Sequence, residues 1–227
     1  MVNYLTTRGL ETKKIQVIHN GANTDLFHFD AKARSAFREM LNLQNKFVVV
    51  YAGLLGIAQG LPAVVEAAGR LAALASNVHF LFIGDGPVKS ALQKQAGSAG
   101  LKNITFLEAQ PRDTIPGYLS AGDIALVPLT RKRLIGALPS KMFDAMACER
   151  PVLLAAKGES SLIMAESSSG LIVAPEDASA LVEAIIQLRD DPELCLTYGQ
   201  NGRRVVENQY SRQALAEQLV GYLERIK

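Results

Sequence analysis

Short apolar runs alternate along the chain with segments in which apolar residues recur at helical spacing. Residues 47–51 (FVVVY) form a continuous β-branched and aromatic run, which is typical of a strand buried on both faces. After it, apolar residues recur at the i, i+3, i+4 spacing of a helix between Leu61 and Ala72. The same reasoning predicts further strands at residues 78–83, 103–107, 123–128, 151–155 and 170–173. Helical patterns lie between most of these strands and fill the chain after residue 177.

Strands that alternate with helices predict βαβ units, parallel strands and right-handed crossovers. We therefore expect an α/β, Rossmann-like doubly wound sheet of about six strands, with helices on both faces and a helical C-terminal tail. The Rossmann-like domain is assigned to residues 46–210 and the last helix to residues 211–227. Residues 1–45 fit this pattern less well, and we interpret them as a lead-in segment in which residues 15–18 form a lone strand.

The composition is that of an ordinary globular protein, and it narrows the function only by exclusion. The chain has 227 residues, 48% of them hydrophobic, no Trp and a formal net charge of +2. This excludes a disordered or collagen-like chain, and the small charge speaks against a nucleic-acid partner. Cys148 and Cys195 show no metal-ligand spacing and fit free thiols in a reducing compartment, so we expect no metal, no cofactor and a cytoplasmic protein. We see no signal peptide and no apolar run of the ~18 residues that a membrane helix needs.

Candidate binding residues follow the predicted strands. In an open parallel sheet, ligands bind beyond the carboxyl ends of the strands, where the strand order reverses. The usual order places this point between the first and fourth strands, so that Gly53 and Gly56 lie opposite residues 131–133 (RKR). Glycines let the backbone approach an anion, and the start of the helix near Ser140 and Lys141 adds free N–H groups. Together these features indicate a phosphate site.

Less specific interpretations of the same residues remain open at this stage. The glycines could only shape a turn, the basic tripeptide could be a solvated loop, and Lys141 could extend into solvent. The histidines are scattered and are interpreted as structural. Gly84-Asp85-Gly86 begins like a dinucleotide motif, but Lys89 stands at its third glycine position, so NAD binding is disfavoured. No P-loop and no Gly-x-Ser-x-Gly motif occurs.

Several segments, in order, resemble one protein family. They are residues 17–27 (VIHNGANTDLF), 51–53 (YAG), 59–61 (QGL), 82–87 (FIGDGP), 138–152 (LPSKMFDAMACERPV) and 170–177 (GLIVAPED). This ordered set resembles the C-terminal, donor-binding half of family 4 glycosyltransferases (glycosyl transferases group 1), which have the two-domain GT-B fold. The form with Pro-Ser-Lys is most similar to transferases of polysaccharide and lipopolysaccharide biosynthesis.

The resemblance implies a nucleoside-diphosphate sugar as the ligand and sugar transfer with retention of configuration. Gly53 and its neighbours would lie under the diphosphate, and Gly84 is a further candidate for substrate binding. Residues 110–112, with Gln110, would hold the base mainly through backbone groups. Asp144 occupies the place of the family's second conserved glutamate, which binds the ribose, and Ser140 begins the same helix.

The sequence also departs from the family pattern. Leu54 and Gln59 stand where the family usually has an Arg and a Lys that clamp the diphosphate. We expect Arg131, Arg133 and Lys141 to replace these cations from the opposite wall. Gly136 stands where the family has its first glutamate, and Glu159 is a candidate for a substitute sugar contact.

A complete enzyme of this kind also needs an N-terminal acceptor domain, which this chain does not include. We therefore interpret the chain as an excised domain or a subunit of a split transferase, inactive in sugar transfer by itself. Its catalytic residues on the acceptor side are unknown, and any membrane contact, at the inner face, would come through the missing half. A non-catalytic nucleotide-binding module is the alternative. A sugar-nucleotide epimerase would need a set of acid and base groups that these loops do not supply.

Overall fold

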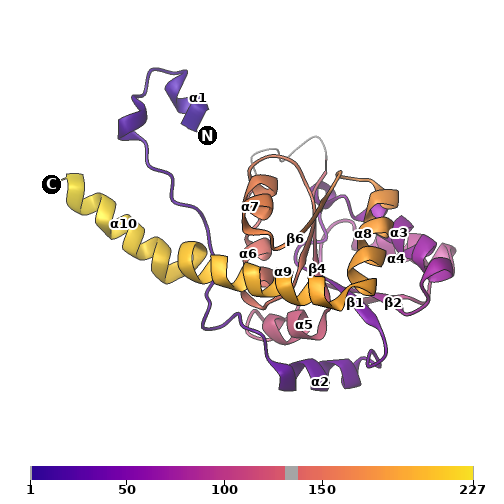
Figure 1. Cartoon of the computed structure of the whole chain (residues 1–227). Helices are drawn as coiled ribbons and strands as arrows, with labels where there is room; N and C mark the ends of the chain where they lie inside the picture. The colour runs from indigo at the N-terminus through magenta and orange to yellow at the C-terminus, as the bar shows by residue number, and fades with distance from the viewer. Residues whose placement is uncertain (1, 131–137, 227) are drawn as a thin grey trace.

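A computed structural model describes residues 2–130 and 138–226 of the chain. In this part, all strands belong to one parallel sheet with the order β3-β2-β1-β4-β5-β6 (Figure 1). The strands are β1 Phe47–Ala52, β2 Val78–Ile83, β3 Ile104–Leu107, β4 Ile124–Pro128, β5 Val152–Ala155 and β6 Gly170–Val173. The predicted doubly wound sheet is therefore confirmed, and each strand lies within a residue or two of its predicted bounds.

Helices connect the strands and fill both ends of the described chain. They are α1 Val2–Thr6, α2 Ala31–Met40, α3 Leu61–Leu74, α4 Lys89–Ser98, α5 Ile115–Ala121, α6 Ser140–Ala147, α7 Glu159–Ser167, α8 Ala178–Asp190, α9 Pro192–Val205 and α10 Arg212–Ile226, with short helical turns η1 Thr12–Lys14, η2 Ile57–Gln59 and η3 Val206–Tyr210. Asp177 caps α8 by accepting a hydrogen bond from the Ala180 N–H, and Ser211 caps α10 in the same way through Ala214. Both caps satisfy N–H groups that have no partner inside a helix.

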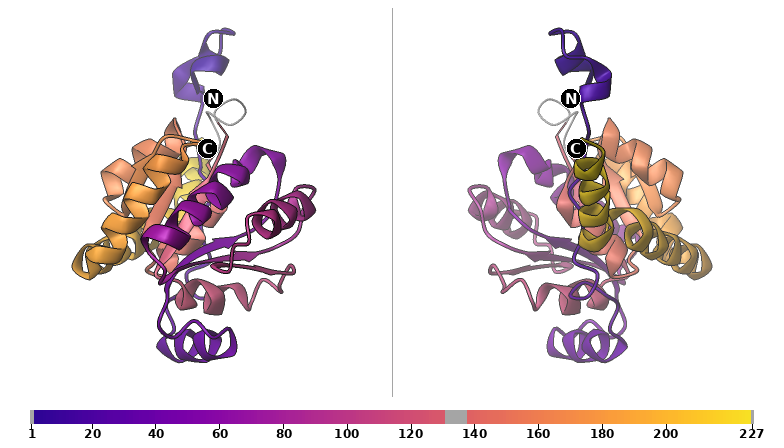
Figure 2. Two further views of the ribbon diagram at one scale, coloured as in Figure 1. Left: turned by 90° about the vertical axis from the view of Figure 1, so that its right-hand side faces the viewer. Right: turned by 90° about the vertical axis from the view of Figure 1, so that its left-hand side faces the viewer.

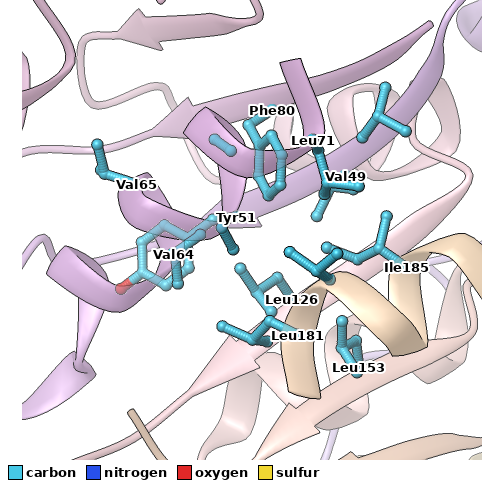
Figure 3. Close-up of a cluster of buried hydrophobic side chains, with 14 of the residues drawn as sticks. Val49, Tyr51, Val64, Val65, Leu71, Phe80, Leu126, Leu153, Leu181 and Ile185 are labelled. Carbon is cyan, nitrogen blue, oxygen red and sulfur yellow. The ribbon is translucent and has the colours of Figure 1, made fainter. Parts of the chain in front are cut away.

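The sheet lies between two layers of helices (Figure 2). Alternate strand residues point to opposite faces, as the pleat requires. Val49 and Tyr51 belong to a core with α3, α4 and α8, part of which Figure 3 shows. Val48 and Val50 belong to a second core with α5, α6 and α7. Burial on both faces explains why these strands are continuous apolar runs in the sequence.

The strand order reverses between β1 and β4, because β1 pairs with β2 on one side and with β4 on the other. This is the predicted switch point. The loops that follow β1 and β2 and the helix that follows β4 meet at the carboxyl edge of the sheet. A ligand site is expected at this place in a doubly wound fold.

The lead-in segment is partly packed onto the domain. Ala22, Phe27 and Leu43 are fully buried in the second core, and α2 packs on α5. Arg34 and Arg38 of α2 both bind the carboxylate of Asp123, at 2.6 and 2.8 Å. These contacts fix the N-terminal part of the described chain to the base of the sheet.

The prediction of a strand at residues 15–18 is wrong. These residues form no strand and pair with none in the described ranges. A strand needs a ladder partner, and the neighbouring backbone bonds elsewhere: Ala22 accepts from the Arg212 N–H and donates to the Tyr210 carbonyl.

The C-terminal helix α10 extends beyond the body of the domain (Figure 1). Its side chains include the exposed Leu219, Val220 and Leu223. Within residues 2–130 and 138–226, no helix is both long and apolar enough to cross a bilayer. Cys148 and Cys195 are free thiols, the first buried and the second partly buried.

Candidate functional site

A cavity of about 470 Å³ opens at the switch point, between the ends of β1 and β2 and the start of α6. Its lining residues are Phe27, Ala52, Gly53, Leu54, Ile83, Gly84, Asp85, Ala109, Gln110, Arg112, Ile115, Ser140, Lys141 and Asp144. Most of the polar groups come from loops and one helix, whereas the strands beneath supply apolar side chains. This combination is typical of a small-molecule site.

Two glycines that require a positive φ form the floor of the cavity. Gly53 has φ +142° and Gly84 has φ +145°. A Cβ at Gly84 would lie 2.0 Å from the carbonyl oxygen of Gly53, so the two loops approach each other more closely than any side chain allows. A Cβ at Gly53 would lie 3.7 Å from the ammonium of Lys141 and within 4 Å of no other side chain that the structure describes. The floor therefore exposes backbone directly beneath that ammonium.

Lys141 reaches from α6 across the cavity to the loop that follows β1. Its Nζ donates to the hydroxyl of Tyr51 at 3.0 Å and to the amide oxygen Oε1 of Gln59 at 2.7 Å. It also lies over the Tyr51 ring, 4.3 Å from the ring centre. Burial disfavours the charged amine and lowers the pKa of Lys141 to about 7.

Asp144 lies one turn after Lys141 on the same helix and faces the same cavity. Burial raises the pKa of its carboxyl group to about 6, even though the Arg112 guanidinium lies 3.5 Å away and lowers it. Arg112 in turn lies over the ring of Phe27, 4.9 Å from the ring centre. A buried carboxyl group beside an exposed guanidinium forms a polar wall opposite the glycine floor.

The loop after β3 contributes Gln110, and both polar atoms of its side-chain amide form hydrogen bonds. Its Oε1 accepts a hydrogen bond from the Tyr118 hydroxyl at 3.3 Å, and its Nε2 donates to the Glu108 carbonyl at 3.2 Å. These bonds fix the rim of the cavity near Arg112.

Replacing Asp144 with asparagine is expected to stabilise the ligand-free chain at neutral pH. Folding raises the pKa of this carboxyl group, so the folded chain is more stable when the group is neutral. That stability is lost as the pH rises from the pKa of the unfolded chain to the folded pKa of about 6. Asparagine cannot ionise, so its advantage over aspartate grows across that window to about 2 kcal/mol. Urea unfolding of both proteins at several pH values measures this difference.

The exposed Asp113, replaced with asparagine, is the matched control, and it should change the unfolding free energy by less than about 0.5 kcal/mol. If the difference in unfolding free energy between the Asp144 variant and the unaltered chain did not depend on pH, burial would not be raising the pKa of the Asp144 carboxyl group, and the prediction would fail.

The structure brings most of the described candidate residues together. Gly53, Leu54, Gly84, Gln110, Ser140, Lys141 and Asp144 all line the one cavity. Gln59 contacts it through Lys141. Glu159 does not line it, and its carboxylate lies 3.7 Å from Nδ1 of His19 instead. Arg131 and Arg133 lie outside the described residues.

Tyr51 is a site residue that the sequence reasoning missed. It was predicted as a core residue of the first strand, and its ring is indeed buried there. Its hydroxyl, however, donates to the Leu54 carbonyl at 2.5 Å and accepts from Lys141. A tyrosine rather than a phenylalanine in a buried strand was the available signal, because a buried hydroxyl needs a partner.

The chain is similar to known proteins in sequence. The family described as Glycosyl transferases group 1 matches residues 33–205. Alpha-D-kanosaminyltransferase of Streptomyces kanamyceticus is 27% identical over 199 residues, which cover 87% of this chain and 50% of that protein. WcaI of Escherichia coli (strain K12), named as a colanic acid biosynthesis glycosyl transferase, is 32% identical over 192 residues, which cover 82% of this chain and 47% of that protein.

A solved structure shares the fold. The crystal structure of Anabaena HepE in complex with UDP and glucose superimposes with a TM-score of 0.84 at 21% identity, covering 99% of this chain and 60% of that protein. The chain thus spans about half the length of the curated relatives it matches.

Proposed function

Because this chain belongs to the family of group 1 glycosyl transferases, we propose that it is the donor-binding half of a retaining glycosyltransferase. The donor is a nucleoside-diphosphate sugar, and the acceptor is a glycan or a lipid-linked sugar. The observation that carries the proposal is the cavity at the switch point, where bare glycine backbone, a helix start and a lysine ammonium converge. The name of WcaI, in colanic acid biosynthesis, supports a glycan product.

The diphosphate is assigned to the floor above Gly53. The start of α6 at Ser140 offers N–H groups that have no partner inside the helix, together with the positive end of the helix dipole. Lys141 adds a cation at the same point. When the bond between the sugar and the diphosphate breaks, negative charge builds up on the departing oxygen. These fixed groups would stabilise that charge without having to reorganise.

The nucleoside is assigned to the opposite wall. The carboxylate of Asp144 can accept hydrogen bonds from ribose hydroxyls, and an anion of this kind is easier to keep buried when such donors satisfy it. The base would lie against the loop of Gln110 and Arg112, whose planar guanidinium can stack on an aromatic ring. The acceptor and its side of the reaction are assigned to a second domain that faces the cavity.

A thermal-shift panel with UDP, GDP and ADP tests this proposal and identifies the base. A ligand at about 100 times its dissociation constant stabilises a protein by about 2.7 kcal/mol, which shifts the unfolding temperature measurably. We expect one of the three nucleotides to raise the unfolding temperature well above the others. We also expect nucleotide binding without appreciable sugar transfer by this chain alone. No shift with any of the three at millimolar concentration would contradict the proposed function.

A further inference from the structure

The ammonium of Lys141 and the side chain of Gln59 come from distant parts of the sequence to one point. Gln59 ends the turn η2 in the loop after β1, whereas Lys141 lies in the first turn of α6. Their side-chain atoms Oε1 and Nζ are 2.7 Å apart. A lysine side chain is one bond longer than that of glutamine, so a lysine at position 59 would bring its own ammonium about 1.5 Å closer to the place that Lys141 Nζ now occupies.

Tyr51 fixes that place from below. Its ring is 1% exposed and packed in the sheet core. Its single hydroxyl proton is used toward the Leu54 carbonyl, so its oxygen is free to accept from Lys141. One buried side chain therefore ties the backbone of the glycine loop and the ammonium of α6 to each other.

The ammonium, which lines the cavity, keeps one donor that neither Tyr51 nor Gln59 uses. A lysine ammonium has three N–H donors, of which Tyr51 and Gln59 take two. The position that a Cβ would take at Gly53 lies 3.7 Å from Nζ, and in the described part of the chain no other atom beyond the adjoining residues lies within 4 Å of it. An anion that rests on the Gly53 backbone would therefore meet the third donor.

We propose that positions 59 and 141 are alternative sources of one diphosphate-binding cation of the site, which Lys141 supplies in this chain, and that Tyr51 and Gln59 are positioning residues for its ammonium. The inference rests on the proposed function, since it assigns how that site is charged. A cation supplied by Lys141 also explains why the loop after β1 lies beside a positive charge although its own residues Leu54 and Gln59 are uncharged.

The test compares nucleotide affinity by isothermal titration calorimetry in a set of variants. The probe is whichever of UDP, GDP and ADP binds most tightly to the unaltered chain. Lys141→Met should weaken binding about ten- to hundredfold, the value of one charged hydrogen bond. The double variant Lys141→Met with Gln59→Lys should regain affinity to within about threefold of the unaltered chain, because the added lysine restores the cation. Lys94→Met, on the exposed face of α4, is the matched control and should change nothing.

Tyr51→Phe tests positioning separately from packing. It keeps the buried ring and removes only the hydroxyl that accepts from the ammonium. The charged amine is then less stabilised, so the pH above which affinity declines should move downward. Among residues 2–130 and 138–226, the other charged groups lining the cavity are Asp144, Arg112 and Asp85, and this variant alters none of them. A purely structural role for the hydroxyl would lower the unfolding temperature without moving the pH profile.

Each outcome separates the inference from the proposed function. If the unaltered chain binds a nucleoside diphosphate and Lys141→Met binds it equally well, the inference is overturned and the proposed function stands. If the double variant unfolds at the same temperature as the single one yet regains no affinity, positions 59 and 141 are not interchangeable. An unmoved pH profile in Tyr51→Phe overturns the positioning role. If no nucleoside diphosphate binds to the unaltered chain, the proposed function fails and the inference fails with it.

Discussion

Replacing Gly84 with alanine is expected to lower the free energy of unfolding by about 3 kcal/mol or more and to abolish nucleotide binding. The added Cβ would lie 2.0 Å from the Gly53 carbonyl oxygen and 3.0 Å from its carbonyl carbon. Both are backbone atoms, so no side-chain rotation relieves the overlap. The φ of +145° adds a conformational penalty that alanine pays and glycine does not. The two loops must move apart, and the floor of the cavity opens with them.

Urea unfolding monitored by circular dichroism, together with calorimetry, measures both effects. The matched control is Gly97→Ala in α4, where a Cβ would meet nothing within 4 Å. This change should leave stability unchanged or raise it by up to about 1 kcal/mol, since alanine favours helix. A Gly84 variant that unfolds within about 1 kcal/mol of the unaltered chain and still binds nucleotide would show that the contact between the two loops is not required.

Nucleotide affinity is expected to fall about tenfold for each unit of pH above about 7. In the ligand-free chain, burial holds the pKa of Lys141 at about 7, so the amine is mostly neutral at higher pH. A diphosphate favours the charged amine and raises that pKa in the complex. When the pH lies above the pKa of Lys141 in the ligand-free chain, nucleotide binding must therefore take up a proton, and each further unit of pH makes that uptake more costly. When the pH lies below that pKa, the amine is already charged, and affinity no longer depends on pH through Lys141.

The other titratable groups of the site do not produce the same fall of nucleotide affinity with pH above about pH 7. Burial raises the pKa of the Tyr51 hydroxyl, so it stays protonated, and the pKa of Asp144 at about 6 lies below the window. The second phosphate ionisation, near about 6, also precedes it. Calorimetry between about pH 7 and pH 9, in buffers of different ionisation enthalpy, would count the protons taken up. The same titration with Lys141→Met should show no proton uptake, and a flat profile in the unaltered chain would remove Lys141 from the diphosphate site.

The architecture was readable from the sequence because each strand carries its own signal. A strand buried on both faces must be apolar throughout, and the helices between strands show their inner face at a different period. These local patterns located β1 to β6, and the sheet has the strand order that is usual for doubly wound folds, which was the premise of the predicted switch point. The glycines after β1 and β2 followed from the same logic, since a ligand floor at a carboxyl edge needs bare backbone.

The tertiary structure decided the features that depend on residues meeting from distant parts of the chain. Residues 15–18 alternate like a strand, yet only the absence of a ladder partner in the described chain shows that they are not one. Glu159 is close in sequence to the carboxyl end of β5, but the direction of its side chain takes it to His19.

The contact of Lys141 with Gln59 and Tyr51 joins α6 to β1 and its loop. Spacing along the chain shows that a lysine begins a helix. Only the packing of that helix over the sheet shows which loop the ammonium reaches, and how far burial changes its charge.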